Sequence, residues 1–140
     1  MLTLDHARTI IATARAKGRE RGLNPLSVLV LDAGGHPLAF EREDGASPGR
    51  FAVAEGKAYG AVMLGMGGRA QLARAEQQPF FMAAMNGAFG GRVVPVPGGV
   101  LVRDAEGRVI GAVGITGDTS DNDAAAATAG IEAAGFTAEA

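Results

Sequence analysis

Residues 28–40 have the sequence VLVLDAGGHPLAF, and residues 100–112 have the sequence VLVRDAEGRVIGA. Both segments follow the pattern Val-Leu-Val-x-Asp-Ala-x-Gly. The apolar, β-branched run at the start of each is typical of a buried strand. The aspartate can hydrogen-bond the backbone of a turn, and the glycine can take the positive φ angle that a tight turn requires. Each segment therefore predicts a β-hairpin, either as two hairpins that share their turn chemistry or as a duplicated half-domain.

Helical patterns lie before, between and after the two predicted hairpins. The predicted helices are residues 4–21, residues 51–66, a stretch that begins at Arg69, and a last helix from Asp123 to about Gly135. The predicted strands are residues 26–32, 37–42, 100–104 and 108–116, with a short extended segment at 92–96. Residues 80–88 fit neither pattern clearly. Hairpins separated by helices predict an α+β fold with a mostly antiparallel sheet.

Length and composition predict one domain that spans residues 1–140, with 47% hydrophobic residues to build its core. The chain has no cysteine, which excludes disulfides, thiol nucleophiles and cysteine-ligated metals. Its 13 basic and 15 acidic residues give no electrostatic footprint for nucleic acid. No apolar run approaches the roughly 20 residues of a membrane span, and the N-terminus lacks the pattern of a signal peptide. We therefore expect a cytoplasmic protein with no nucleic acid or membrane partner.

Residues 111–123, GAVGITGDTSDND, end a predicted strand in a run of carboxylates. A calcium site would use Asp118, Asp121 and Asp123, but their spacing departs from the calcium-loop pattern. A phosphate site would use Gly117 ahead of a helix, beside carboxylates that repel the anion. The favoured interpretation is a helix cap, with Asp123 accepting backbone N–H groups of the last helix.

Two side chains outside this segment suggest chemistry. Lys57 lies mid-helix among small residues, where burial would lower its pKa, although its side chain could equally reach solvent. Arg42 follows a predicted strand, and it either pairs with Asp44 or binds a ligand carboxylate through two hydrogen bonds. The only histidines, His6 and His36, fit no zinc pattern, so we predict no metal-ion site.

Residues 2–58 and 90–123 together resemble the GlcG/HbpS proteins, also found as the C-terminal domain of PduO-type proteins. The resemblance covers nearly the whole chain. It implies a single profilin-like α+β domain, with a five-stranded antiparallel sheet packed with helices, that forms a homo-oligomer. The many small residues of the predicted helix 51–66 bury little area and predict a dimer or larger, since association adds buried apolar surface. The family's motif positions fall on Asp32, Gly35, Arg42, Asp44, Gly45, Lys57, Pro97, Gly98, Gly99, Gly111, Gly114, Gly117 and Asp123.

The resemblance also implies binding of a small ligand, with haem or a related tetrapyrrole as the first hypothesis and haem as the cofactor. Some haem-binding members have a histidine late in the first helix, where this chain has Lys17. The iron ligand would then come from His6 or His36. The flexible backbone of Gly98 and Gly99 is expected near the ligand.

Two other hypotheses remain open. The first is an enzyme that deaminates or hydrolyses an enamine or imine of a small carboxylated metabolite. Lys57 would be the base or nucleophile, assisted by Glu55 or Asp44. Arg42 would hold the carboxylate, with the Thr116 hydroxyl and the backbone N–H of Gly117 close to the ligand. The second is an assembly module without chemistry that oligomerises through an exposed sheet face.

Overall fold

The computed structural model describes the whole chain, residues 1–140, as five helices and five strands. Their bounds are α1 (Leu4–Glu20), β1 (Ser27–Asp32), β2 (Pro37–Arg42), α2 (Arg50–Leu64), α3 (Gly68–Gln77), α4 (Pro79–Ala88), β3 (Gly99–Arg103), β4 (Val109–Thr116), α5 (Ser120–Ala133) and β5 (Thr137–Glu139). The expected α+β class is confirmed, as is the five-stranded antiparallel sheet that the resemblance implied. None of the helices has the length and apolar character needed to span a bilayer.

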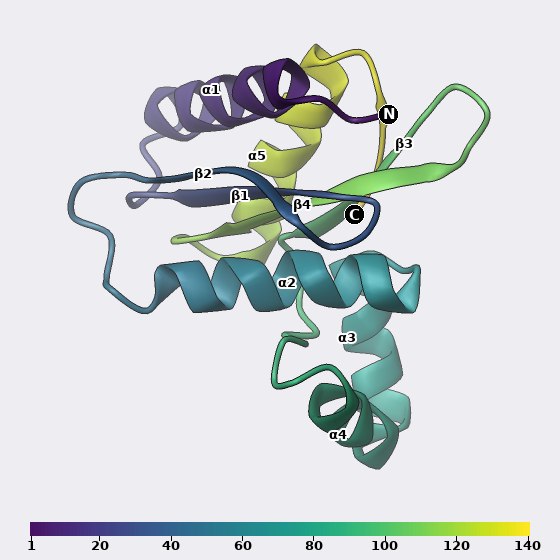
Figure 1. Cartoon of the computed structure of the whole chain (residues 1–140). Helices are drawn as coiled ribbons and strands as arrows, with labels where there is room; N and C mark the ends of the chain where they lie inside the picture. The colour runs from purple at the N-terminus through teal and green to yellow at the C-terminus, as the bar shows by residue number, and fades with distance from the viewer.

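The sheet has the strand order β2-β1-β4-β3-β5, and every neighbouring pair is antiparallel. Helices α1 and α5 cover one face and α2 covers the other, which gives three layers (Figure 1). Alternate strand residues supply the two faces. Val28 and Val30 join the larger apolar core under α1 and α5, whereas Leu29 and Leu31 join the smaller core under α2.

Both predicted hairpins form, and their turns use the predicted chemistry. In each turn the aspartate, Asp32 or Asp104, accepts the backbone N–H groups two and four residues ahead at 2.9–3.0 Å. The glycines Gly35 and Gly107 have φ angles of 82° and 80°. The β1–β4 pairing joins the two hairpins side by side, so local turns and one long-range pairing determine most of the sheet.

Helix α2 lies directly on the backbone of β3 and β4. A Cβ atom at Gly114 would collide with the carbonyl oxygen of Ala54, and one at Gly99 would collide with the carbonyl oxygen of Lys57. The α2 layer is consequently built from small residues, with Ala54, Ala58 and Ala61 fully buried. Close packing of backbone on backbone replaces the large side chains that a thicker core would use.

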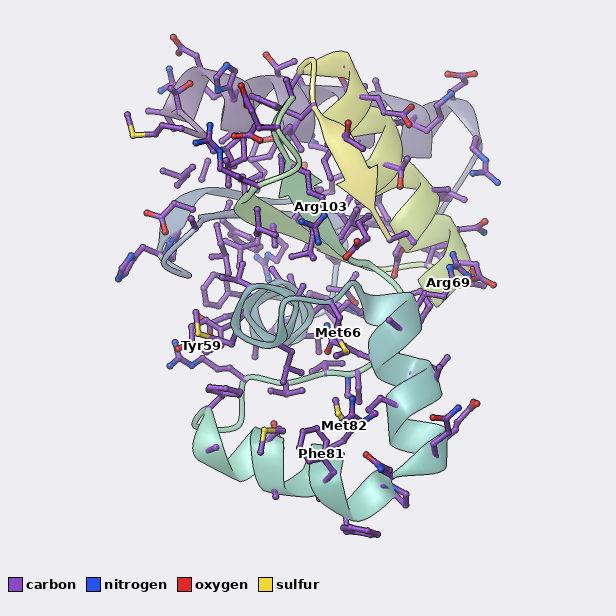
Figure 2. All side chains as sticks on the ribbon, turned by 90° about the vertical axis from the view of Figure 1, so that its right-hand side faces the viewer. Tyr59, Met66, Arg69, Phe81, Met82 and Arg103 are labelled. Atoms are coloured by element: carbon purple, nitrogen blue, oxygen red, sulfur yellow. The ribbon has the colours of Figure 1, made fainter.

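Helices α3 and α4 form an arm that projects from α2 away from the sheet (Figure 1). Met66 and Met82 lie between α2 and the arm, and the Arg74 guanidinium lies 4.5 Å from the ring centroid of Phe81 (Figure 2). Phe80, in the first turn of α4, is 80% exposed. The arm includes the ambiguous residues 80–88, which the structure places in α4.

Replacement of Gly114 by alanine is expected to destabilise the protein, because the new methyl group forces α2 away from the sheet. Overpacking of this kind costs about 1–3 kcal/mol. The matched control is Gly87→Ala in α4, where a methyl group meets nothing within 4 Å. We expect this control to be neutral or slightly stabilising, since alanine is the better helix former. Urea unfolding of the three proteins measures both effects, and equal stability of Gly114→Ala and its parent would contradict the close approach.

Candidate functional site

The side chain of Lys57 is buried between α2 and the end of β4, and only 3% of the residue is exposed. Its Nζ atom donates to the carbonyl oxygen of Ile115 at 3.0 Å and to Oδ2 of Asp123 at 3.3 Å. Asp123 is 1% exposed and belongs to the first turns of α5. The ion pair therefore connects the helix on one face of the sheet with a helix on the other.

The prediction that Asp123 caps the last helix is wrong. Helix α5 begins three residues earlier, and its N-cap is Thr119, whose hydroxyl accepts the N–H of Asn122 at 3.2 Å. Asp123 lies inside the helix, where its second oxygen accepts the N–H of Asp118 at 3.0 Å. The run TSDND offers several residues that cap about equally well, so local preference could not select among them.

The other two carboxylates of this segment are also held by the protein. Asp118 accepts the backbone N–H of Asn24 at 3.0 Å and the side-chain amide of Asn122 at 2.8 Å. Asp121 pairs with Arg69 of α3 at 3.1 Å (Figure 2). These contacts give each carboxylate a structural partner, and no three histidine or carboxylate side chains of the protein gather as metal ligands do.

Burial shifts the titration of both members of the ion pair towards their neutral forms. It lowers the pKa of Lys57, while the attraction and hydrogen bond of Asp123 offset part of that shift. The positive charge of Arg50 lowers the pKa of Lys57 further. Burial likewise raises the pKa of Asp123, against the hydrogen bond from Asp118 and the attraction of Lys57. The charged form of Lys57 is thus favoured by Asp123, and that of Asp123 by the backbone N–H of Asp118 together with Lys57.

The Pro97–Gly99 turn closes over the Lys57 ammonium. A Cβ atom at Gly98 would lie 2.8 Å from Nζ, and the φ angle of Gly98 is 114°. The two glycines predicted to bind ligand thus pack against Lys57. The predicted partners Glu55 and Asp44 make no contact with Nζ; Glu55 is half-buried on α2, and Asp44 is exposed after β2. The catalytic role of Lys57 stays a prediction, and it requires this turn to open.

Thr116 and Arg50 form a second polar contact on the same face of the sheet. The buried hydroxyl of Thr116 accepts from Nη1 of Arg50 at 2.7 Å. Arg42 lies on the same side, exposed at the end of the edge strand β2. Gly117 is less accessible to a ligand than Arg42, because Gly117 packs against the backbone of Pro25. Arg50 was not among the predicted site residues. Its position at the start of a helix with no acidic residue in the first turn could have indicated an unpaired cation.

One open hollow, of about 220 Å³, lies beside α1 and has a mostly charged lining, formed by Arg15, Arg19, Pro25, Glu43 and Asp44. Glu43 is buried and accepts the N–H of Leu26 at 2.7 Å, and both Arg15 and Arg19 bond its carboxylate at 3.2 Å. These opposite charges compensate one another. Lys17, on the same helix, pairs with Glu20 at 3.9 Å.

A second hollow, of about 360 Å³, lies beside the β1–β2 turn and is mostly apolar. Its lining consists of Met1, Leu2, Asp32, Ala33, Gly34, Leu38 and Ile110. His36 stands next to it, with its ring against Gly34 and its Nδ1 atom 3.4 Å from Oδ1 of Asp32. The His36 side chain is 80% exposed. An apolar wall and an accessible imidazole are therefore found together at this edge of the sheet.

These features define a single-domain α+β protein with a helical layer on each face of one antiparallel sheet. The chain belongs to the HbpS-like family, because the family model described as haem degrading protein HbpS-like matches residues 2–132. No curated protein sequence matches the chain.

Three solved structures illustrate the similarity. The protein ORFY of Klebsiella pneumoniae has 27% sequence identity and a TM-score of 0.84, over 94% of this chain and 89% of its own. A double mutant of HbpS from Streptomyces reticuli has 28% identity and a TM-score of 0.79, over 94% and 85%. A PduOC–haem complex has 22% identity and a TM-score of 0.86, over 99% of both chains, and at this identity it shares the fold.

Replacement of Asp123 by asparagine is expected to destabilise the protein by about 3–5 kcal/mol, because it leaves the buried Lys57 ammonium without its charge partner. Thr119→Ala should cost less, about 0.5–2 kcal/mol, as the loss of an N-cap does. The double variant Lys57→Met/Asp123→Leu should recover part of the loss, since no charge stays buried. Chemical denaturation of the four proteins gives the order. An Asp123→Asn variant as stable as the parent would contradict the structural role of the buried ion pair.

Asp118 should contribute stability that disappears in acid. Hydrogen bonds from Asn122 and the backbone N–H of Asn24 lower its pKa to about 2. Because the folded pKa lies below the unfolded value of about 4, the contribution is complete above the unfolded value and is lost as pH falls towards 2. The difference in unfolding free energy between the parent and Asp118→Asn should therefore be constant above about pH 5 and shrink below it. A difference that does not change between pH 6 and pH 2 would contradict the assignment.

Proposed function

We propose that this protein binds haem or a related tetrapyrrole at the apolar hollow beside the β1–β2 turn. The observation that carries the proposal is the position of His36 next to this hollow of about 360 Å³. The family supports the ligand class, since its model is described as haem degrading and one related fold is that of a haem complex.

The chemistry of the hollow fits a porphyrin. Leu2, Leu38 and Ile110 provide an apolar wall for the macrocycle. The volume lies near the lower end of the ~300–1,000 Å³ range of small-molecule sites, so one edge of a macrocycle would lie in the hollow and the other outside it. A tetrapyrrole bound in this way leaves its polar edge in water, where carboxylate groups are well solvated.

Of the two histidines, His36 is the better placed to bind iron. The Nδ1 atom of His36 faces the carboxylate of Asp32, and such a second partner orients an imidazole and makes its free nitrogen a stronger ligand. In contrast, His6 uses its Nδ1 atom to accept the N–H of Thr3, and its ring packs edge-on against Phe136. Lys17 is a poor substitute for the histidine of other family members, because an ammonium group has no lone pair for iron.

When bound, haem supplies one-electron redox chemistry at its iron. The residues of this chain would bind and orient the group: the apolar wall would exclude water from one side, and the Asp32 carboxylate beside Nδ1 would orient the His36 ring. Nothing in this arrangement uses Lys57.

Titration of the purified protein with haemin should give a saturable shift of the Soret band with a fixed stoichiometry. His36→Ala should weaken binding at least tenfold and change the band position, since the iron loses its imidazole ligand. His6→Ala is the matched control, because it removes the other histidine and should leave the band unchanged. Absence of saturation, or an unaltered spectrum in His36→Ala, would overturn the proposal.

A further inference from the structure

Two arginines at one corner of the sheet, Arg42 and Arg50, have no carboxylate partner. Arg42 ends β2, is exposed, and makes no side-chain hydrogen bond or ion pair. The guanidinium of Arg50 donates only to hydroxyl groups, those of Ser47 at 3.1 Å and Thr116 at 2.7 Å. The loop between the two arginines includes Asp44, which pairs with neither of them. Neither guanidinium group is therefore neutralised by direct contact with a carboxylate.

Ser27 lies between these arginines with a buried hydroxyl that has no hydrogen-bond partner. Ser27 is directly opposite Arg42 on one neighbouring strand and directly opposite Thr116 on the other. Residues opposed in this way project from the same face of the sheet, and here it is the face that α2 covers. An unpaired buried hydroxyl costs stability. A ligand that hydrogen-bonds the Ser27 hydroxyl would therefore be favoured at this position.

The start of α2 adds to the positive potential of the same corner. This 15-residue helix begins at Arg50, and no side chain caps its N-terminus. Its first turn contains no acidic residue. The unpaired N–H groups and the positive end of the helix dipole therefore face the corner together with the two guanidinium groups.

We propose that this corner binds a small molecule through a carboxylate group, with Arg42 and Arg50 as its cationic partners. The planar forks of two arginines match the planar carboxylate through paired hydrogen bonds. Arg50 turns from Thr116 to the ligand, which exposes the hydroxyl groups of Thr116 and Ser27 as further donors. The unsatisfied hydroxyl of Ser27 gains a partner only in the bound state.

This carboxylate site is separate from the tetrapyrrole hollow. It lies at the Ser27 end of β1 on the face of α2, whereas the hollow lies at the Asp32 end. Apolar residues of the hollow belong to the core on the other face. Failure of either proposal therefore leaves the other intact, and haemin does not have to be present in the test.

The test follows the side-chain Nε–H signals of the arginines by NMR during titration with sodium acetate and sodium succinate. Chloride keeps the ionic strength constant, and inorganic phosphate is titrated in parallel. The signals of Arg42 and Arg50 should shift saturably with the carboxylates. Arg42→Gln should weaken this binding at least fivefold. The matched control is Arg8→Gln, which removes an exposed arginine at the start of α1 and should leave the affinity unchanged.

Ser27→Ala separates binding from folding. The free variant should melt at the same temperature as the parent or higher, because an unpaired buried hydroxyl is removed, while its carboxylate affinity falls. No saturable shift at either arginine, or equal weakening by Arg8→Gln, would overturn the proposal. Tighter binding of phosphate than of both carboxylates would overturn the ligand class. Unchanged affinity in Ser27→Ala would remove Ser27 from the site.

Discussion

The buried ion pair between Lys57 and Asp123 is the contact on which the arrangement of the layers depends. Removing an ammonium and a carboxylate from water costs several kcal/mol for each ion, and their attraction offsets this only when further hydrogen bonds satisfy both groups. The backbone supplies these bonds, through the carbonyl of Ile115 and the N–H of Asp118. Both backbone groups lie at the end of β4 or just after it. The pair therefore positions α2, the end of β4 and the start of α5 relative to one another.

The glycines around Lys57 follow from the same constraint. The ammonium reaches Ile115 and Asp123 only if α2 lies close to the sheet, and a Cβ atom at Gly99 or Gly114 would prevent that approach. This close approach leaves little space for side chains between α2 and the sheet. Seven buried apolar residues form the core under α2, against seventeen under α1 and α5, so α2 gains little from hydrophobic burial. A polar contact and close backbone packing hold this helix where large apolar side chains would otherwise do so.

The parts of the structure that the sequence predicted are those determined by neighbouring residues. Both hairpins follow from an aspartate and a glycine a few residues apart, and the turns form as the pattern requires. The start of α5 was misplaced because Asp123 satisfies the local rules for a cap while a residue far away in the sequence, Lys57, requires it elsewhere. Strand β5 was missed because three residues carry no detectable period. The corner formed by Arg42, Arg50 and Ser27 could not be predicted from the sequence. The neighbours of Ser27 depend on strand register, which no local pattern encodes.

Polar groups that already have hydrogen-bond or ion-pair partners serve the structure of this protein, whereas polar groups without such partners are candidates for ligand binding. Lys57 attracted a catalytic hypothesis from sequence, yet its ammonium, like the carboxylates of the acidic segment after β4, already has partners in the fold. A ligand would have to displace those contacts before gaining its own. Arg42 and Arg50 form no ion pair, and the Ser27 hydroxyl has no hydrogen-bond partner. His36 keeps one accessible ring nitrogen. Binding at these groups adds interactions without breaking the contact that holds the layers together. Ligand chemistry is thus expected at the two ends of β1, with the ion pair left intact between α2 and α5.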